Sequence, residues 1–373
     1  LQTSFQRRNM DGGSNVEDLH VSGLVFDAKF DSGNLASVEQ RVGGGPSDFI
    51  LTTRCDVANV PNRGTWFYFA VRCGEQSSGA GPQWHERILQ FEVRNMNPQV
   101  VLFEQGMRPV VRSLPSKPAW TRMAEYTKVS GTAAGKDFAI HFTHKITSPA
   151  SETLYFAFCP AHSYGDSLAR MAWLDSLFDQ PAAEVAFGRA AAAVATAAAT
   201  FGANDVSARA REAAGLPPRA AGDQRAAAQR AALEASADLG LRARSWRLHA
   251  ELADASAEGT ADVLPSRRPV GVYYRRELLT YSVEGRRIDL LTISGHNGVV
   301  RATEPPLGEP LLPDGGPRPV RFPRKKYVLI TSRVHPGETP ASFVLDGLLA
   351  FLLREDDPRA IRLRANFGAS SGF

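Results

Sequence analysis

The side chains best suited to bind a catalytic metal ion are a histidine and a glutamate three residues apart. They are His335 and Glu338, in the tetrapeptide His-Pro-Gly-Glu. A neutral imidazole and a carboxylate on one turn can both reach a single Zn²⁺, and Pro336-Gly337 sets a rigid residue beside a permissive one. A catalytic zinc takes three protein ligands and keeps an open position for water, whose pKa falls to about 7. The pair would therefore supply two of the three ligands of a hydrolytic zinc site.

The pair alone is a weak signal. The chain contains eight histidines, so about half a His-x-x-Glu match is expected by chance. A loop histidine followed by a glutamate that complements the dipole of a helix start would give the same spacing without any metal. The flanking elements and the wider string must therefore decide between these two interpretations.

The elements around the pair predict a strand, a loop and a helix. The apolar run KYVLIT at Lys326–Thr331 predicts a short strand, and open α/β sheets usually bind ligands at the carboxyl ends of such strands. After the loop 332–338, Thr339 and Pro340 are typical of an N-cap and a first helical position. The helix should continue to about Arg354 with one wide apolar face, formed by Phe343, Val344, Leu345, Leu348, Leu349, Phe351 and Leu352. Upstream, 277–283 and 286–293 flank Glu284-Gly285, which predicts a hairpin turn.

The N-terminal part has a different pattern, with short alternating runs from Val21 to Cys159 bounded by Gly, Pro, Asn and Ser. Apolar side chains alternate with polar ones at 89–94 and again at 138–143. Period-two alternation of this kind predicts antiparallel strands with one face in a core. We therefore expect an N-terminal antiparallel β-sandwich of roughly 140 residues.

Two segments separate this region from the second domain. The period changes to a helical one at 163–178, which predicts a linker helix. From Pro181 to Thr260, 30 of 80 residues are alanine and few are large and apolar. Such a composition cannot supply much of a core, so we expect a partly helical surface insertion.

Composition excludes several classes of protein. The chain has 43% hydrophobic and 22% charged residues, and no apolar run approaches the ~20 residues of a membrane-spanning helix. The N-terminus lacks the apolar core of a secretory signal, and three widely spaced cysteines give no disulfide framework. We expect a cytoplasmic protein that neither enters a membrane nor binds nucleic acid. A net charge of +4 favours an acidic partner only weakly.

The wider string Thr331-Ser-Arg-Val-His-Pro-Gly-Glu-Thr-Pro-Ala-Ser-Phe-Val closely resembles the first zinc-binding segment of the cytosolic carboxypeptidase family. The resemblance extends back through 274–294 (YRRELLTYSVEGRRIDLLTIS) and forward to the Glu355-Asp-Asp-Pro-Arg stretch. That family also carries a β-domain before its peptidase domain. The resemblance thus covers most of the chain apart from the N-terminal tail, the alanine-rich insertion and the last few residues.

The resemblance implies a zinc metallocarboxypeptidase, a hydrolase with a metal-binding site at His335 and Glu338. Proteolysis would remove C-terminal or branch-point glutamates from tubulin tails or another polyglutamylated protein, in the cytoplasm and in association with microtubules. The sequence pattern and the resemblance together predict five segments: a disordered tail (1–20), the β-sandwich (21–160), a linker helix (161–180), the insertion (181–265) and the start of the zinc-carboxypeptidase α/β domain (266–373).

The implied site is incomplete in this sequence. Family members carry a further histidine ligand, arginine and asparagine groups for the substrate carboxylate, and a glutamate general base. None of these is matched up to Phe373, so we identify no catalytic residue and expect the general base beyond Phe373. The ending ANFGASSGF departs from the family, where another strand should follow. We therefore expect a C-terminally truncated, inactive fragment; the alternative is a non-catalytic module that binds tubulin or another protein and retains a peptidase remnant.

Other polar residues are weaker candidates. Arg333 is a candidate for substrate binding, and with the four cations of 321–326 (RFPRKK) it could steer an acidic tail toward His335. His162 and His296 are expected to be solvated loop residues outside the site. His85, His141 and His144 are expected to be structural, with His141 and His144 on opposite faces of one strand.

Overall fold

The structure is a computed structural model that describes residues 19–55, 64–74, 84–131, 137–178, 265, 267–282, 286–308, 311–312, 317–335 and 337–372. The predicted tail lies outside the described residues except for its last two positions, and the predicted insertion lies outside them except for residue 265. The strands of the described residues belong to three sheets, two in the N-terminal part and one in the C-terminal part.

The N-terminal part contains two sheets among the described residues. One has the strand order β1 (Leu19–Val21), β2 (Leu24–Asp27), β5 (Tyr68–Cys73), β11 (Thr153–Ala157), β7 (Val110–Leu114) and β8 (Lys117–Arg122). The other has the order β3 (Ser37–Gln40), β4 (Asp48–Thr52), β6 (Ile88–Arg94), β10 (Ala139–Lys145) and β9 (Lys128–Ser130). A short helix, α1 (Val100–Glu104), precedes β7.

The two sheets share one aromatic core. Phe91 of β6 lies 5.5 Å from Phe69 and 5.2 Å from Phe156, ring centroid to ring centroid, and these partners belong to the other sheet. All three rings are buried because alternate residues of each strand face inward. The pairing is not wholly antiparallel as the sequence predicted, since β4 and β6 run parallel from Asp48↔Gln90 to Thr52↔Arg94.

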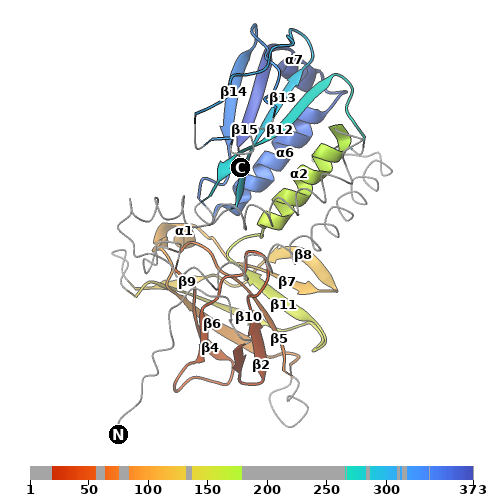
Figure 1. Cartoon of the computed structure of the whole chain (residues 1–373). Helices are drawn as coiled ribbons and strands as arrows, with labels where there is room; N and C mark the ends of the chain where they lie inside the picture. Colours follow the sequence, from red (N-terminus) through yellow and green to blue (C-terminus); the bar gives the residue numbers. More distant parts are fainter. Residues whose placement is uncertain are drawn as a thin grey trace, which may run out of the picture.

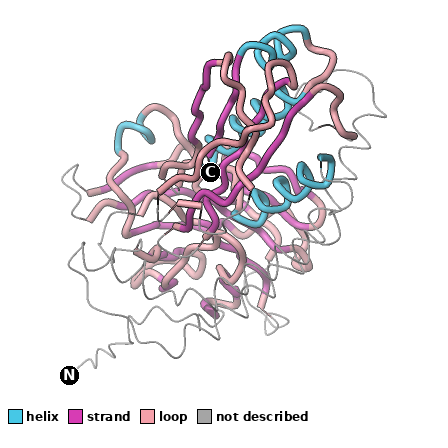
Figure 2. Tube along the Cα trace, turned by 45° about the horizontal axis from the view of Figure 1, so that its top comes forward, coloured by secondary structure: helices cyan, strands magenta, loops and turns pink. Residues whose placement is uncertain are grey.

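The C-terminal part is one sheet covered by helices. Its strand order is β12 (Val272–Tyr281), β13 (Arg287–Gly295), β15 (Phe367–Gly372) and β14 (Lys326–Thr331). The helices are α2 (Tyr164–Phe178), α6 (Thr339–Leu353) and α7 (Pro358–Asn366). Figures 1 and 2 show α2 and α6 beside each other on one side of this sheet. Their apolar faces form one buried cluster with Val272, Leu291 and Ile293.

Helix α2 follows the N-terminal sheets in the chain but packs in the C-terminal core. Arg276 of β12 reinforces this packing, because its guanidinium donates to Asp175 of α2 and to Asp289 of β13, each at 2.8 Å. Burial alone would raise the pKa of the Asp289 carboxyl, but Arg276 and Arg287 hold that pKa below its usual value. The predicted linker helix is thus a structural part of the second unit.

Several local predictions are confirmed. Strand β14 has the predicted bounds, β12 and β13 pair as the predicted hairpin, and α6 begins at Thr339 and ends one residue before Arg354. The turn 283–285 itself lies outside the described residues. The ending 365–373 was expected to depart from the family, where another strand should follow; residues Phe367–Gly372 do form a strand, β15, which pairs in parallel with β14.

Two local predictions are wrong. The N-cap of α6 is Glu338 instead of Thr339, and no side chain caps this helix. Phe343 and Val344, which were assigned to its apolar face, are 46% and 73% exposed, so the buried face is narrower than predicted.

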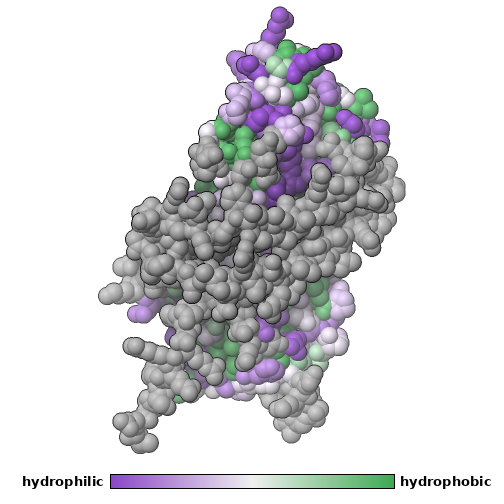
Figure 3. All heavy atoms as spheres, viewed as in Figure 1, coloured by the Kyte–Doolittle hydropathy of each residue, from purple (hydrophilic) through white to green (hydrophobic). Residues whose placement is uncertain are grey.

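Strand β14 lies at one edge of the C-terminal sheet among the described strands and carries exposed apolar side chains. Tyr327, Val328 and Leu329 are all exposed, Leu329 most of all. Figure 3 shows hydrophobic and hydrophilic side chains interspersed over this upper part of the molecule. No second described strand pairs with the outer side of β14, so this edge combines an open strand side with apolar surface.

Candidate metal centre

His335 and Glu338 lie close together in the loop Ser332–Glu338, here called the metal loop, which joins β14 to α6. His335 Nδ1 is 2.8 Å from Glu338 Oε1. Both side chains are exposed, at 73% and 56%. A local turn brings them together, because the Glu338 N–H donates to the His335 carbonyl at 3.1 Å. Pro336 lies outside the described residues.

The donor atoms of this pair fit a shared zinc ion. Imidazole nitrogen and carboxylate oxygen are ordinary zinc ligands, and bonds of about 2.0–2.2 Å at a tetrahedral angle would place them about 3.3 Å apart. The present 2.8 Å separation between Nδ1 and Oε1 therefore has to open by only about 0.5 Å to admit the ion. The pair can supply two ligands from one loop.

Gly337 brings the metal loop against the N-terminal part. A Cβ added to Gly337 would collide with the Thr65 hydroxyl and lie 3.2 Å from Thr65 Cβ. Thr65 stands just before β5, in the segment between Gly64 and Tyr68. The absence of a side chain at Gly337 thus permits a close contact beside the pair.

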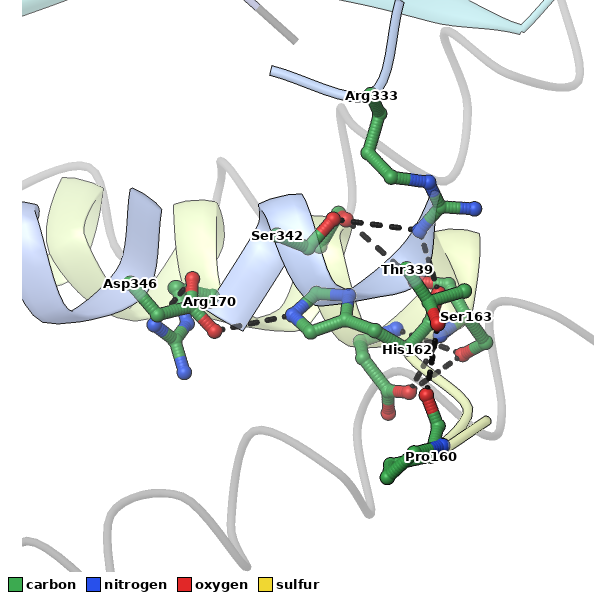
Figure 4. A network of polar contacts seen from close by, with 10 residues as sticks. Pro160, His162, Ser163, Arg170, Arg333, Thr339, Ser342 and Asp346 are labelled. Carbon is green, nitrogen blue, oxygen red and sulfur yellow. Dashed lines mark hydrogen bonds and ion pairs between the residues drawn. The ribbon is translucent and has the colours of Figure 1, made fainter. Parts of the chain in front are cut away.

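Arg333 turns toward the protein two residues before His335. Its Nη1 donates to the His162 carbonyl at 2.8 Å and to Ser342 Oγ at 3.2 Å. Figure 4 shows the guanidinium reaching from the loop toward α6 and the chain near His162. Burial lowers the pKa of this guanidinium, which nevertheless stays charged in proteins. The backbone is in the left-handed region at φ 55°, uncommon for a residue with a side chain.

The segment 159–163, here called the connector, lies between β11 and α2 in the chain and contacts α6. His162 Nε2 is 3.0 Å from Asp346 Oδ2, and Arg170 of α2 forms an ion pair with the same carboxylate. His162 is 3% exposed, so the prediction of a solvated loop histidine is wrong. The cause is Asp346, which offers a buried carboxylate to the ring (Figure 4).

A second contact joins the connector to the first turn of α6. Thr339 Oγ1 donates to the Pro160 carbonyl at 2.8 Å and lies 3.0 Å from Cys159 Sγ. Burial raises the pKa of the Cys159 thiol. Thr339 therefore bonds to the connector instead of capping its own helix.

Sequence reasoning missed the residues that support the loop, namely Thr65, Ser342 and Asp346. The sequence held one signal for two of them. Ser342 and Asp346 recur with Leu349 and Leu353 at helical spacing, and all four are buried. Polar residues on the core face of an amphipathic helix call for a buried partner.

Four further histidines of the described residues were predicted to lie outside the site. His296 is in an exposed loop, as predicted, and His85 is exposed at a turn. His141 Nε2 lies 2.7 Å from Ser130 Oγ on one face of β10, whereas the His144 ring contacts Phe156 at 5.2 Å on the other. The prediction of opposite faces is confirmed.

The basic run 321–326 differs from its predicted form at Lys325. Its ammonium is buried and donates to Ser294 Oγ and to the carbonyls of Gly295 and Arg364, at 2.8 to 2.9 Å. Lys325 therefore cannot attract a ligand in solution. Arg324 and Lys326 are exposed.

Within the described residues, no group of three or more His, Cys, Asp or Glu side chains is arranged to hold a metal ion. The described helices also include none long and apolar enough to cross a bilayer.

Comparisons with known proteins give consistent matches over nearly the whole chain. It is 32% identical over 376 residues to cytosolic carboxypeptidase-like protein 5 of Rattus norvegicus, covering 94% of this chain and 34% of that protein. The Danio rerio protein of the same name is 30% identical over 369 residues, covering 94% and 31%. A metallo-carboxypeptidase structure from Pseudomonas aeruginosa aligns with a TM-score of 0.41 and 16% identity, over 93% of this chain and 54% of that one. No family model matches. The chain spans about a third of the length of these curated relatives.

Proposed function

We propose that the protein is a zinc-dependent carboxypeptidase acting on glutamate tails. This chain belongs to the cytosolic carboxypeptidase family of metallocarboxypeptidases. The observation that carries the proposal is the exposed His335–Glu338 pair, whose facing atoms are 2.8 Å apart on a supported loop. The substrate would be a C-terminal or branch-point glutamate of tubulin or another polyglutamylated protein. We place the protein in the cytoplasm, associated with microtubules.

Each side chain of the pair has a definite task in this proposal. His335 Nδ1 and Glu338 Oε1 face each other, so they are the atoms that would hold the ion. When bound, zinc would polarise the scissile carbonyl and lower the pKa of a water molecule. The exposure of both side chains leaves room on the solvent side for a peptide terminus. A role for Arg333 in substrate binding stays a prediction. In the structure its guanidinium donates hydrogen bonds to the His162 carbonyl and to Ser342 Oγ.

An acidic substrate agrees with the charge of the chain. The net charge is +4, and Arg324 and Lys326 are exposed at the start of β14, the strand that leads to the metal loop. Exposed cations raise the encounter rate with anionic ligands in a salt-dependent way. Capture of glutamate tails should accordingly weaken as ionic strength rises.

We further propose that residues 1–373 alone hydrolyse such tails far more slowly than a complete relative. The metal loop supplies two ligands, whereas a catalytic zinc takes three, and hydrolysis also needs a base and a clamp for the substrate carboxylate. These groups would come from residues outside the described part of the chain.

The test uses peptides ending in several glutamates and glutamylated tubulin, with the protein made from the complete transcript. We expect glutamate release that chelator abolishes and Zn²⁺ restores, and that His335→Ala lowers by at least about a thousandfold. His296→Ala, which alters an exposed loop histidine outside the pair, should leave the rate unchanged. Chelator-resistant release would contradict the proposal. Binding of glutamylated tubulin without loss of glutamate would support a non-catalytic binding module instead.

A further inference from the structure

The metal loop is held on both sides of the ligand pair by residues that precede β12 in the chain. On the β14 side, Arg333 Nη1 bonds to the connector carbonyl of His162 at 2.8 Å. Between the two ligands Gly337 packs against Thr65, and on the α6 side Thr339 Oγ1 donates to the Pro160 carbonyl at 2.8 Å. The pair itself projects into solvent between these contacts. The support and the ligands thus come from different parts of the sequence.

Arg333 is the residue on which the first side of this support depends. One guanidinium nitrogen reaches the connector and also Ser342 of α6, so a single side chain joins three segments. The Arg333 backbone occupies the left-handed region at φ 55°, which persists only where surrounding contacts compensate its cost. The side-chain bonds are such contacts. They also fix the direction in which the chain enters His335.

The acceptors of Arg333 are themselves rigid. Ser342 is fully buried on α6, and His162 is held through its ring by Asp346. Asp346 in turn pairs with Arg170 of α2. Figure 4 shows this set of contacts running from the loop across α6 to α2. A ligand loop fixed to rigid helices keeps its geometry better than a free one.

From these contacts we infer that Arg333 is a positioning residue for the zinc ligands, and that through it the connector orders the metal loop before metal binds. This inference rests on the proposed function in that it takes His335 and Glu338 as ligands. Partners that orient metal ligands from outside the coordination shell typically affect metal affinity by about tenfold or more.

The experiment compares variants of the 373-residue chain by amide hydrogen exchange of residues 333–342 and by Zn²⁺ titration calorimetry. Arg333→Asn removes the guanidinium but keeps a residue type that tolerates the left-handed region. We expect exchange in the loop to accelerate and Zn²⁺ affinity to fall, each by about tenfold. Arg333→Lys can reach one acceptor at a time, so it should restore part of the slow loop exchange and part of the Zn²⁺ affinity. Ser342→Ala removes one acceptor and leaves every residue of the metal loop unsubstituted. It should give a smaller change in loop exchange and in Zn²⁺ affinity, in the same direction.

Arg354→Asn is the matched control, since it removes an exposed arginine just past the other end of α6. It should leave loop exchange and Zn²⁺ affinity unchanged. Unchanged loop exchange in Arg333→Asn and in Ser342→Ala would overturn the inference. If His335→Ala and Glu338→Gln bind Zn²⁺ as the parent does, the proposed ligands are wrong, whatever Arg333 does to the loop. If amide hydrogen exchange accelerates over the whole chain in Arg333→Asn, that variant has unfolded generally. The loop exchange of Ser342→Ala then tests the inference in its place.

Discussion

His162 Nε2 lies 3.0 Å from Asp346 Oδ2, so the connector after the first β-rich part is bonded to a helix of the second part. Both side chains are nearly inaccessible to water, and Arg170 shares the carboxylate. A buried carboxylate with two nitrogen partners fixes the relative position of three segments. It also makes the junction sensitive to the loss of one charge.

Asp346→Asn should destabilise the fold because it leaves Arg170 buried beside a neutral amide. Breaking one member of a buried ion pair costs about 3 kcal/mol or more in the free energy of unfolding. Urea denaturation followed by tryptophan fluorescence would measure the loss. Asp356→Asn, in an exposed pair with Arg354, should give no measurable change. Equal stability of the two variants would mean that the His162–Asp346 contact does not support the junction.

Gly337→Ala should displace the metal loop from Thr65, because the added methyl group would collide with the Thr65 hydroxyl. We expect a loss of about 1–3 kcal/mol in the free energy of unfolding, together with weaker Zn²⁺ binding. Thermal unfolding with and without Zn²⁺ would measure both. Gly308→Ala, where the added atom meets nothing within 4 Å, is the control. The double variant Gly337→Ala, Thr65→Gly should recover part of the loss.

The imidazole of His144 should make the protein less stable as the pH falls from neutral. Burial lowers the pKa of this ring from 6.5 to about 4, with a smaller contribution from Lys117. Well above pH 6.5 the ring is neutral in both folded and unfolded chains. Between pH 6.5 and 4 the unfolded chain binds a proton that the folded one excludes, so stability declines by at most about 3 kcal/mol.

His144→Phe tests this pH dependence because a phenyl ring can keep the contact with Phe156 and cannot titrate. Denaturation midpoints between pH 7 and 4 should decline less steeply in this variant than in the parent. The exposed His85 provides the control, and His85→Phe should leave the slope unchanged. An identical slope in the His144 variant would mean that other groups cause the acid sensitivity.

Leu329→Lys on β14 should reduce self-association of the 373-residue chain. Leu329 is 69% exposed on an edge strand among the described strands. Lysine on an edge opposes strand pairing between molecules, and the substitution removes exposed apolar surface. Light scattering at increasing protein concentration should be lower for this variant than for the parent, and the midpoint of thermal unfolding should not fall. If scattering is unchanged, the aggregation-prone surface lies elsewhere.

The local elements around the pair could be predicted from sequence because their signals are local. KYVLIT gave β14 its bounds, and Thr339-Pro340 located the start of α6 within one residue of its cap. The 2.8 Å approach of His335 to Glu338 also agrees with their three-residue spacing on a turn.

The contacts that support the pair could not be predicted in this way. His162 and Asp346 are 184 positions apart, and Thr339 and Pro160 are 179 apart. Periodicity reports which face of an element is apolar, but it does not report which distant carbonyl or carboxylate meets a polar residue on that face. The same limit explains the errors at His162 and Lys325, since polar residues in loops become buried only when tertiary partners surround them.

The placement of α2 sets a time order for folding during synthesis. Its apolar face packs with β12, β13 and α6, yet α2 ends at Phe178 and β12 begins at Val272, 94 positions later. At translation rates of about 5–20 residues per second, that face waits roughly 5–20 s on the ribosome before the first strand of its partner sheet is made. During these seconds the described partners of this helix in the C-terminal sheet and in α6 have not yet been made, and a chaperone can bind its apolar face.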